Sequence, residues 1–164
     1  MTELHTWLEN IKVWYQTPPP PQQRDIQTLI DALNHAPDII FTDVSCEVHN
    51  EALAYWLDAC QRLSFYYQDL PDIDKAFSYK QFGYAKLQSM ICEQTLEPDL
   101  KRWCLKKLDR MIVGMMEFCQ KQNTQQWLDE STQIINLHVA FMEGQNNLNL
   151  SYESLVKKDN YASL

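Results

Sequence analysis

Glycine is scarce in this chain of 164 residues, which contains only Gly83, Gly114 and Gly144. All-β folds and phosphate-binding loops both depend on glycine at tight turns, so the shortage disfavours both. No apolar stretch approaches the roughly 20 residues that a membrane-spanning helix needs. No apolar run follows a basic start at the N-terminus, so we expect no signal peptide. These absences predict a soluble protein of the cytoplasm.

Paired cysteines are also lacking. The chain has an odd number of cysteines, five, and no two of them have CxxC spacing. Both features favour free thiols in a reducing compartment. Most fall in apolar helical patterns, where burial raises a thiol pKa. Cys46 is the exception, because it precedes a predicted helix and His49 follows three residues later. A Cys–His dyad is therefore an alternative at this position.

Motifs for nucleophilic catalysis, such as GxSxG, are absent from the sequence. We therefore expect no cofactor, and the sequence favours a non-enzymatic protein over an enzyme.

The charge is unevenly distributed. The formal net charge is −8, which argues against general binding to nucleic acid. Residues 1–71 carry ten acidic and three basic side chains, whereas residues 72–122 carry seven acidic and nine basic ones. The acidic first part of the chain favours a basic protein partner. A homodimer is a further alternative.

Helical spacing of apolar residues dominates the chain and predicts an all-α fold. Four long helices of similar length, joined by short connections, imply antiparallel neighbours. We expect an up-down four-helix bundle with two N-terminal helices packed on it and a short C-terminal helix. The bundle helices are predicted at about 47–70, 73–96, 98–122 and 125–143, the N-terminal helices at about 2–16 and 24–35, and the last helix at about 151–158.

The length suits a single domain spanning residues 1–164. Within it, residues 17–23 contain four consecutive prolines, Pro18 to Pro21. Such a segment is stiff and polyproline-like, so we expect a spacer between the N-terminal helix and the rest. Residues 38–46 are predicted to form an apolar loop packed on the bundle.

One stretch, residues 48–70, carries a clear helical seam. Steps of four and three residues along it give the seam residues His49, Leu53, Trp56, Cys60, Leu63, Tyr67 and Leu70. The apolar residues from Leu53 to Leu70 predict plain core. His49, at the first position of the seam, is a candidate functional residue.

A metal site is one hypothesis for that histidine. His49 and His138 lie on predicted helices that are antiparallel neighbours, and both fall near the same end of the bundle. Glu93 is expected at a similar level, so the three side chains could converge on a metal ion. Two separately hydrogen-bonded histidines are the alternative. No glutamate has a histidine three residues later, which argues against a di-iron site.

Two other groups of side chains are candidate binding surfaces. Arg102, Lys106 and Arg110 recur every four residues and would share one helix face. They are candidates for binding an anionic group on a partner, with a solvated face as the alternative. Aromatic residues between 65 and 84 should cluster near Pro71, either as a ligand pocket or as ordinary core and rim packing, which we favour.

Two functional hypotheses follow from these observations. The first is a non-enzymatic interaction protein, namely a regulator, adaptor or neutraliser of a basic partner. It draws on the acidic first part and on the many aromatic and Met residues, types that are enriched at interfaces. The alternative is a helical bundle that binds a small ligand or metal, as an enzyme or sensor, centred on His49 and His138.

Overall fold

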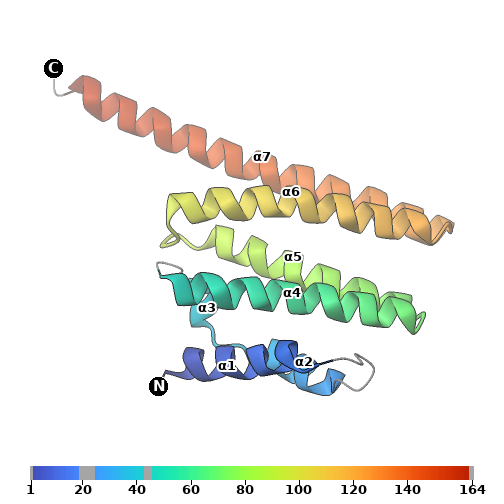
Figure 1. Cartoon of the computed structure of the whole chain (residues 1–164). Coiled ribbons are helices and arrows are strands. Elements are labelled where there is room, and N and C mark those ends of the chain that lie inside the picture. Colours follow the sequence, from blue (N-terminus) through green and yellow to red (C-terminus); the bar gives the residue numbers. More distant parts are fainter. Residues whose placement is uncertain (1, 19–24, 43–45, 163–164) are drawn as a thin grey trace. The chain divides into compact units, whose positions relative to one another are not determined.

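The computed structural model describes residues 2–18, 25–42 and 46–162, with side-chain surroundings as far as Asn146. Every regular element in these ranges is a helix, as Figure 1 shows. The all-α helical prediction is therefore confirmed. The helices are α1 (Glu3–Gln16), α2 (Ile26–Asn34), α3 (Ile39–Thr42), α4 (Glu47–Asp69), α5 (Ile73–Cys92), α6 (Pro98–Lys121) and α7 (Gln125–Ala162).

The chain divides into two compact units, Met1–Met111 and Ile112–Leu164. The boundary falls inside the continuous helix α6, so the expectation of one domain stays a prediction. The up-down order of all four long helices spans both units and likewise stays a prediction. Of the predicted spacer at 17–23, residues 19–23 lie outside the described part of the chain.

Helices α4 and α5 form the centre of the first unit. They are joined by a tight turn at Pro71, after which the Asp72 side chain caps α5 by accepting a hydrogen bond from the Lys75 backbone N–H. The predicted seam of α4 is buried at five consecutive positions, which are Leu53, Trp56, Cys60, Leu63 and Tyr67. Leu70, the last predicted position, is instead 55% exposed, because α4 has already ended at Asp69.

The three N-terminal helices pack against α4 in this unit, as predicted for the first two. Trp7 on α1 donates from Nε1 to the carbonyl of Ala32 on α2 at 2.8 Å. Trp56 on α4 donates from Nε1 to the carbonyl of Leu33 at 3.2 Å. Each indole thus satisfies a backbone carbonyl near the end of α2 while its ring is buried.

The second unit begins within α6 and continues through α7. A short turn joins the two helices, and Asn123 adopts a positive φ of 54° there. Asparagine tolerates this left-handed conformation better than most residues. Thr124 then caps α7 by accepting from the Trp127 backbone N–H, and the Phe118 and Trp127 rings meet edge to face at 5.7 Å.

Two predicted helix ends, one predicted short helix and one predicted loop are wrong. Helix α7 runs through Gly144 to Ala162, so the predicted end at 143 and the separate helix at 151–158 do not exist. Gly144 does not adopt a positive φ. A glycine inside a helix lowers helix stability by only about 1 kcal/mol relative to alanine, so the helix can continue through it. Helix α5 ends at Cys92 rather than 96, because Glu93 is extended. The predicted loop at 38–46 contains the short helix α3.

Candidate functional site

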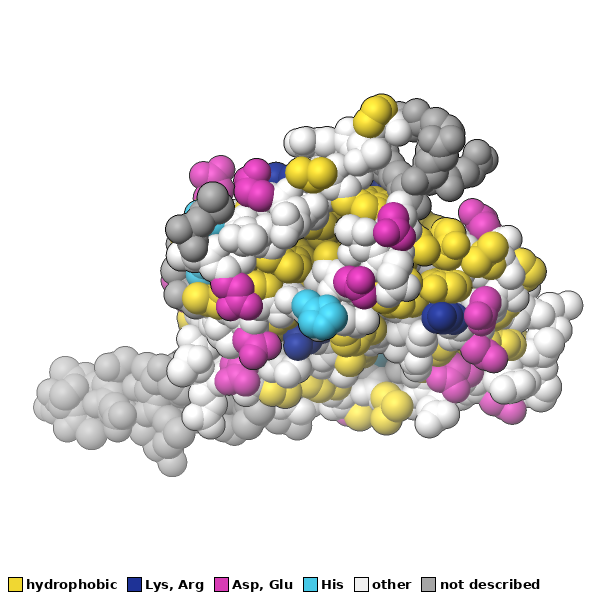
Figure 2. All heavy atoms as spheres, turned by 90° about the horizontal axis from the view of Figure 1, so that it is seen from below, with side chains coloured by type: hydrophobic (Ala, Val, Ile, Leu, Met, Phe, Trp, Pro, Cys, Tyr) yellow, Lys and Arg dark blue, Asp and Glu magenta, His cyan; other side chains and the backbone are white. Residues whose placement is uncertain are grey.

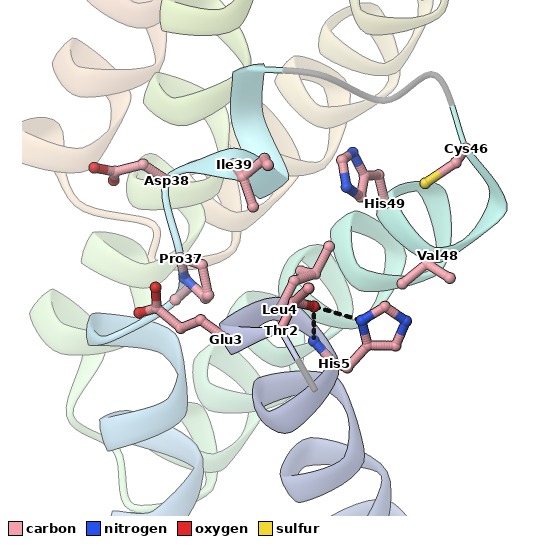
Figure 3. Close-up of a pocket in the computed structure, with 11 residues that line it drawn as sticks. Thr2, Glu3, Leu4, His5, Pro37, Asp38, Ile39, Cys46, Val48 and His49 are labelled. Atoms are coloured by element: carbon pink, nitrogen blue, oxygen red, sulfur yellow. Dashed lines mark hydrogen bonds between the residues drawn. The ribbon is translucent and has the colours of Figure 1, made fainter.

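The start of α4, where His49 lies, borders a pocket of about 570 Å³ in the first unit. Three segments line it, as Figure 3 shows: the first turn of α1, the connection from α2 into α3, and the first turn of α4. The lining includes His5, His49 and Cys46, together with the acidic residues Glu3 and Asp38. This pocket therefore brings together ionisable side chains that are far apart in the sequence.

Helix capping places two of the walls. Thr2 caps α1, where its hydroxyl accepts from the His5 backbone N–H and also hydrogen-bonds the His5 Nδ1. Cys46 occupies the corresponding position of α4 but makes no side-chain capping bond. A helix start favours serine, threonine, aspartate or asparagine at this position. The thiol of Cys46 is thus exposed beside the pocket rather than used as a cap.

The predicted pair of Cys46 and His49 does line one pocket, but sequence reasoning missed His5. A histidine in an exposed first turn carries no signal of its own, and only the packing of α1 against α4 brings it here. In the described ranges, no group of three or more His, Cys, Asp or Glu side chains is placed to hold a metal ion.

The other predicted metal ligands lie elsewhere in the chain. Glu93 is exposed at the C-terminal cap of α5 in the first unit. His138 lies on α7 in the second unit, where its side chain is 5% exposed. His49 and His138 therefore belong to different units, and a metal site formed by His49, His138 and Glu93 stays a prediction.

The predicted basic side chains lie on an exposed face of α6 within the first unit. We call Arg102, Lys106 and Arg110 the basic row, and all three are exposed. Arg102 pairs with Asp99 one turn earlier. Within the described part of the chain, neither Lys106 nor Arg110 forms an ion pair. Trp103 lies beside them and is 44% exposed, which is high for an indole.

Acidic side chains are spread over α1, α2 and the segment before α3. Figure 2 views the side on which α1 and α2 lie in Figure 1, and acidic side chains are prominent there while basic ones are few. We call the exposed carboxylates of this region the acidic face; they are Glu3, Glu9, Asp25, Asp31 and Asp38.

The described basic side chains in this part of the chain are already paired with acids on α4. Lys12 lies 2.8 Å from Glu51, and Arg62 lies 2.8 Å from Asp58. Lys12 also interacts electrostatically with Glu9 on the acidic face, so it offsets part of that charge. The five exposed carboxylates still outnumber these two cations.

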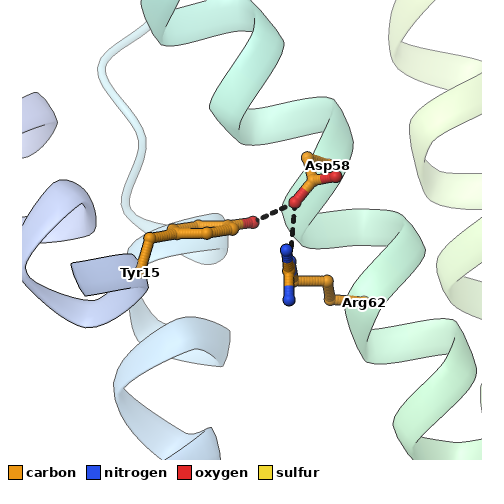
Figure 4. Close-up of polar contacts among 3 residues, drawn as sticks. All are labelled: Tyr15, Asp58 and Arg62. Carbon is orange, nitrogen blue, oxygen red and sulfur yellow. Dashed lines mark hydrogen bonds and ion pairs between the residues drawn. The ribbon is translucent and has the colours of Figure 1, made fainter. Parts of the chain in front are cut away.

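The Arg62 pair belongs to a small network that fastens the end of α1 to α4, drawn in Figure 4. The Tyr15 hydroxyl donates to the same Asp58 oxygen at 2.6 Å, and the Arg62 guanidinium lies 4.7 Å from the centre of the Tyr15 ring. Burial, followed by the hydrogen bond to Asp58, raises the Tyr15 pKa well above its ordinary value. A hydroxyl held protonated in this way has a structural role.

The aromatic residues between 65 and 84 divide into buried and exposed rings. The Tyr67 and Tyr79 rings stack at 5.7 Å near the Pro71 turn, and the Lys75 ammonium lies over Tyr67. Phe65 is 50% exposed and Tyr66 is 38% exposed. This mixture agrees with packing at the core and its rim, the interpretation that we favoured from the sequence.

None of the described helices has a segment both long and apolar enough to cross a membrane. The chain matches no model of a known protein family, no curated protein and no solved structure.

Proposed function

We propose that this protein is a non-enzymatic interaction protein whose acidic face binds a basic partner protein. The observation that carries the proposal is the set of exposed carboxylates on α1, α2 and the segment before α3. The nearby cations Lys12 and Arg62 are each engaged by an acid on α4. The acidic face therefore carries more negative charge than these two cations offset, and that excess is available to a partner.

Such a surface acts mainly on the rate and specificity of association. Complementary charges steer two proteins together and exclude partners of the wrong sign. Affinity then comes from aromatic and arginine side chains that become fully buried in the contact. The same unit also carries exposed rings, such as Phe65 and Tyr66 near the end of α4.

The proposal can be tested by affinity capture from a lysate of the native host. Immobilised wild-type protein should retain one stoichiometric partner with a basic isoelectric point. The variant Glu9→Gln/Asp31→Asn removes two charges from the acidic face and should retain at least several-fold less. The control Asp69→Asn/Glu93→Gln removes the same charge elsewhere and should retain as much as wild type. Equal capture by all three proteins, or no stoichiometric partner, would overturn the proposal.

The pocket beside His49 favours a second candidate function, the binding of a small ligand. Its volume of about 570 Å³ lies in the range of small-molecule sites. Protein purified from the native host would be analysed by native mass spectrometry and for metal content. A bound compound or metal that is lost in His49→Ala would support this function. Protein that carries no bound compound or metal, and whose native mass equals that of the chain alone, would contradict it.

A further inference from the structure

We propose that the basic row on α6 binds the acidic face of a second copy of this chain. The inference rests on the proposed function, because it uses the same acidic face. It identifies a second copy of the chain as a binding partner, and it gives a role to the basic side chains of α6, which the proposed function does not use. Both surfaces lie in the first unit, so the contact needs only that unit from each copy.

The basic row has the geometry of a binding stripe. Its three side chains recur every four residues, which places them about 6 Å apart along one side of the helix. Lys106 and Arg110 make no ion pair within the described residues, so their charges are available. The exposed Trp103 adds a large apolar surface next to these charges. Tryptophan and arginine are the residue types that most often dominate the energy of an interface.

Charge complementarity identifies the occupant of this stripe. A row of cations requires an anionic surface, and the acidic face of the same chain is one. Glu9, Asp25 and Asp31 are exposed on α1 and along α2, so a stripe on a helix can approach them, whereas Glu3 and Asp38 also line the pocket beside His49. Every cell that makes this chain therefore contains a matching partner for the basic row.

Net charge decides the conditions under which the contact forms. The chain carries −8, so two copies repel each other at long range. At about 0.1 M salt the screening length is about 10 Å, which weakens this repulsion while opposite charges in contact still attract. At about 1 M salt the screening length is about 3 Å, and the contact pairs weaken as well. Self-association should therefore be strongest at moderate salt.

The contact joins two different surfaces, so it is of the head-to-tail type. While it is formed, the acidic face of one copy is covered and cannot bind another protein. A basic partner and a second copy would then compete for the same face.

Exchange of charges between the two surfaces tests the proposal by analytical ultracentrifugation. The weight-average mass of wild type should rise with concentration at about 0.1 M salt and fall toward the monomer at about 1 M. Glu9→Lys/Asp31→Lys and Lys106→Glu/Arg110→Glu should each remain monomeric alone, because each places like charges against each other. An equimolar mixture of the two should associate again, since the reversed face of one meets the reversed row of the other.

Two controls keep the outcome unambiguous. Asp69→Lys/Glu93→Lys makes the same charge change at two helix C-termini, where lysine is well tolerated, and should associate like wild type. Circular dichroism shows whether each variant is folded. Trp103→Ala should weaken association at least several-fold without changing its salt dependence.

Monomeric wild type at every concentration would overturn the inference, as would a mixture that does not associate when both variants are folded. These outcomes are separate from the test of the proposed function. A monomer that still captures a basic partner through its acidic face would refute the second-copy contact alone.

Discussion

The first turn of α4 and the rest of that helix provide opposite environments for similar side chains. At the start, Cys46 is exposed and His49 is half-buried beside the pocket. Farther along, Cys60 is 4% exposed and Trp56 is 1% exposed. A single helical spacing assigns His49 and Trp56 to the same face. The difference between them shows that the spacing determines the face, whereas the neighbouring helices determine how deeply each position is buried.

Both ends of the seam illustrate this lesson. His49 lies in the first turn of α4, where the neighbouring segments leave a pocket. Leu70 follows the last helical residue and is exposed. The five seam positions between them are buried in a helix that packs against both α5 and the N-terminal helices.

Thiol reactivity should show the largest contrast between the two parts of α4. We expect iodoacetamide to alkylate Cys46 at least about a thousandfold faster than Cys60, because Cys60 reacts only when its surroundings open. Burial also raises the pKa of the Cys60 thiol, which leaves less thiolate. Peptide mass spectrometry over time measures both rates. The exposed Cys92 is the control and should react like Cys46. Comparable rates for Cys46 and Cys60 would contradict the comparison.

Truncation of the seam should cost far more stability than truncation of the first turn. Trp56→Ala removes a buried ring and should lower the free energy of unfolding by about 3–5 kcal/mol. His49→Ala should change it by less than about 1 kcal/mol. Urea titrations followed by circular dichroism measure both. If Trp56→Ala does not fold, Trp56→Phe keeps most of the apolar area and should lose an intermediate amount. Equal losses at positions 49 and 56 would refute the distinction.

Alkaline pH should destabilise the protein through the buried thiol of Cys60. Burial raises the Cys60 pKa in the folded state, so above about pH 9 the unfolded state loses this proton first and binds fewer protons. Stability is therefore intact below that pH and falls as the pH rises. Between its unfolded-state and folded-state pKa values, one such group lowers the free energy of unfolding by about 1.4 kcal/mol for each pH unit. Urea titrations from about pH 8 to 10.5 should give a steeper fall for wild type than for Cys60→Ala. Parallel curves would show that Cys60 does not contribute.

The smallest expected effect is at Gly83, which faces the seam from α5. A Cβ there would lie 3.5 Å from the Cys60 Cβ and 3.4 Å from the Met111 Cε, both ordinary contacts. Gly83→Ala should therefore raise the free energy of unfolding by up to about 1 kcal/mol through helix propensity. Gly114→Ala, where a Cβ meets nothing within 4 Å, is the matched control. Gly83→Leu should instead destabilise by about 1–3 kcal/mol through overpacking. A stabilising effect of Gly83→Leu would contradict the close contact of Gly83 with Cys60 and Met111.

Much of the fold could be predicted because its signals are local. Helices α1, α5 and α7 begin at the capping residues Thr2, Asp72 and Thr124. Pro71 lies in the turn between α4 and α5. Gly144 misled the prediction because glycine ends a helix only when the chain turns there. The residues next to Gly144 do not indicate whether the chain turns there.

The candidate site could be predicted only in part. Cys46 and His49 are near each other in sequence, and their proximity to one pocket follows from a helix start. His5 joins them through the packing of α1 on α4, which involves residues distant in sequence. The basic row was visible from its four-residue spacing, and the structure adds that Trp103 is exposed beside it.

The sequence by itself determined the helical class, most helix boundaries and the uneven charge, because these depend on neighbours within about one or two helical turns. Only the tertiary structure decided which members of each apolar stripe are buried, and which ionisable side chains share a pocket. Burial depends on what covers a position, and the covering residues come from elsewhere in the chain. For α4, one regular pattern therefore became a core along most of its length and a pocket wall at its first turn.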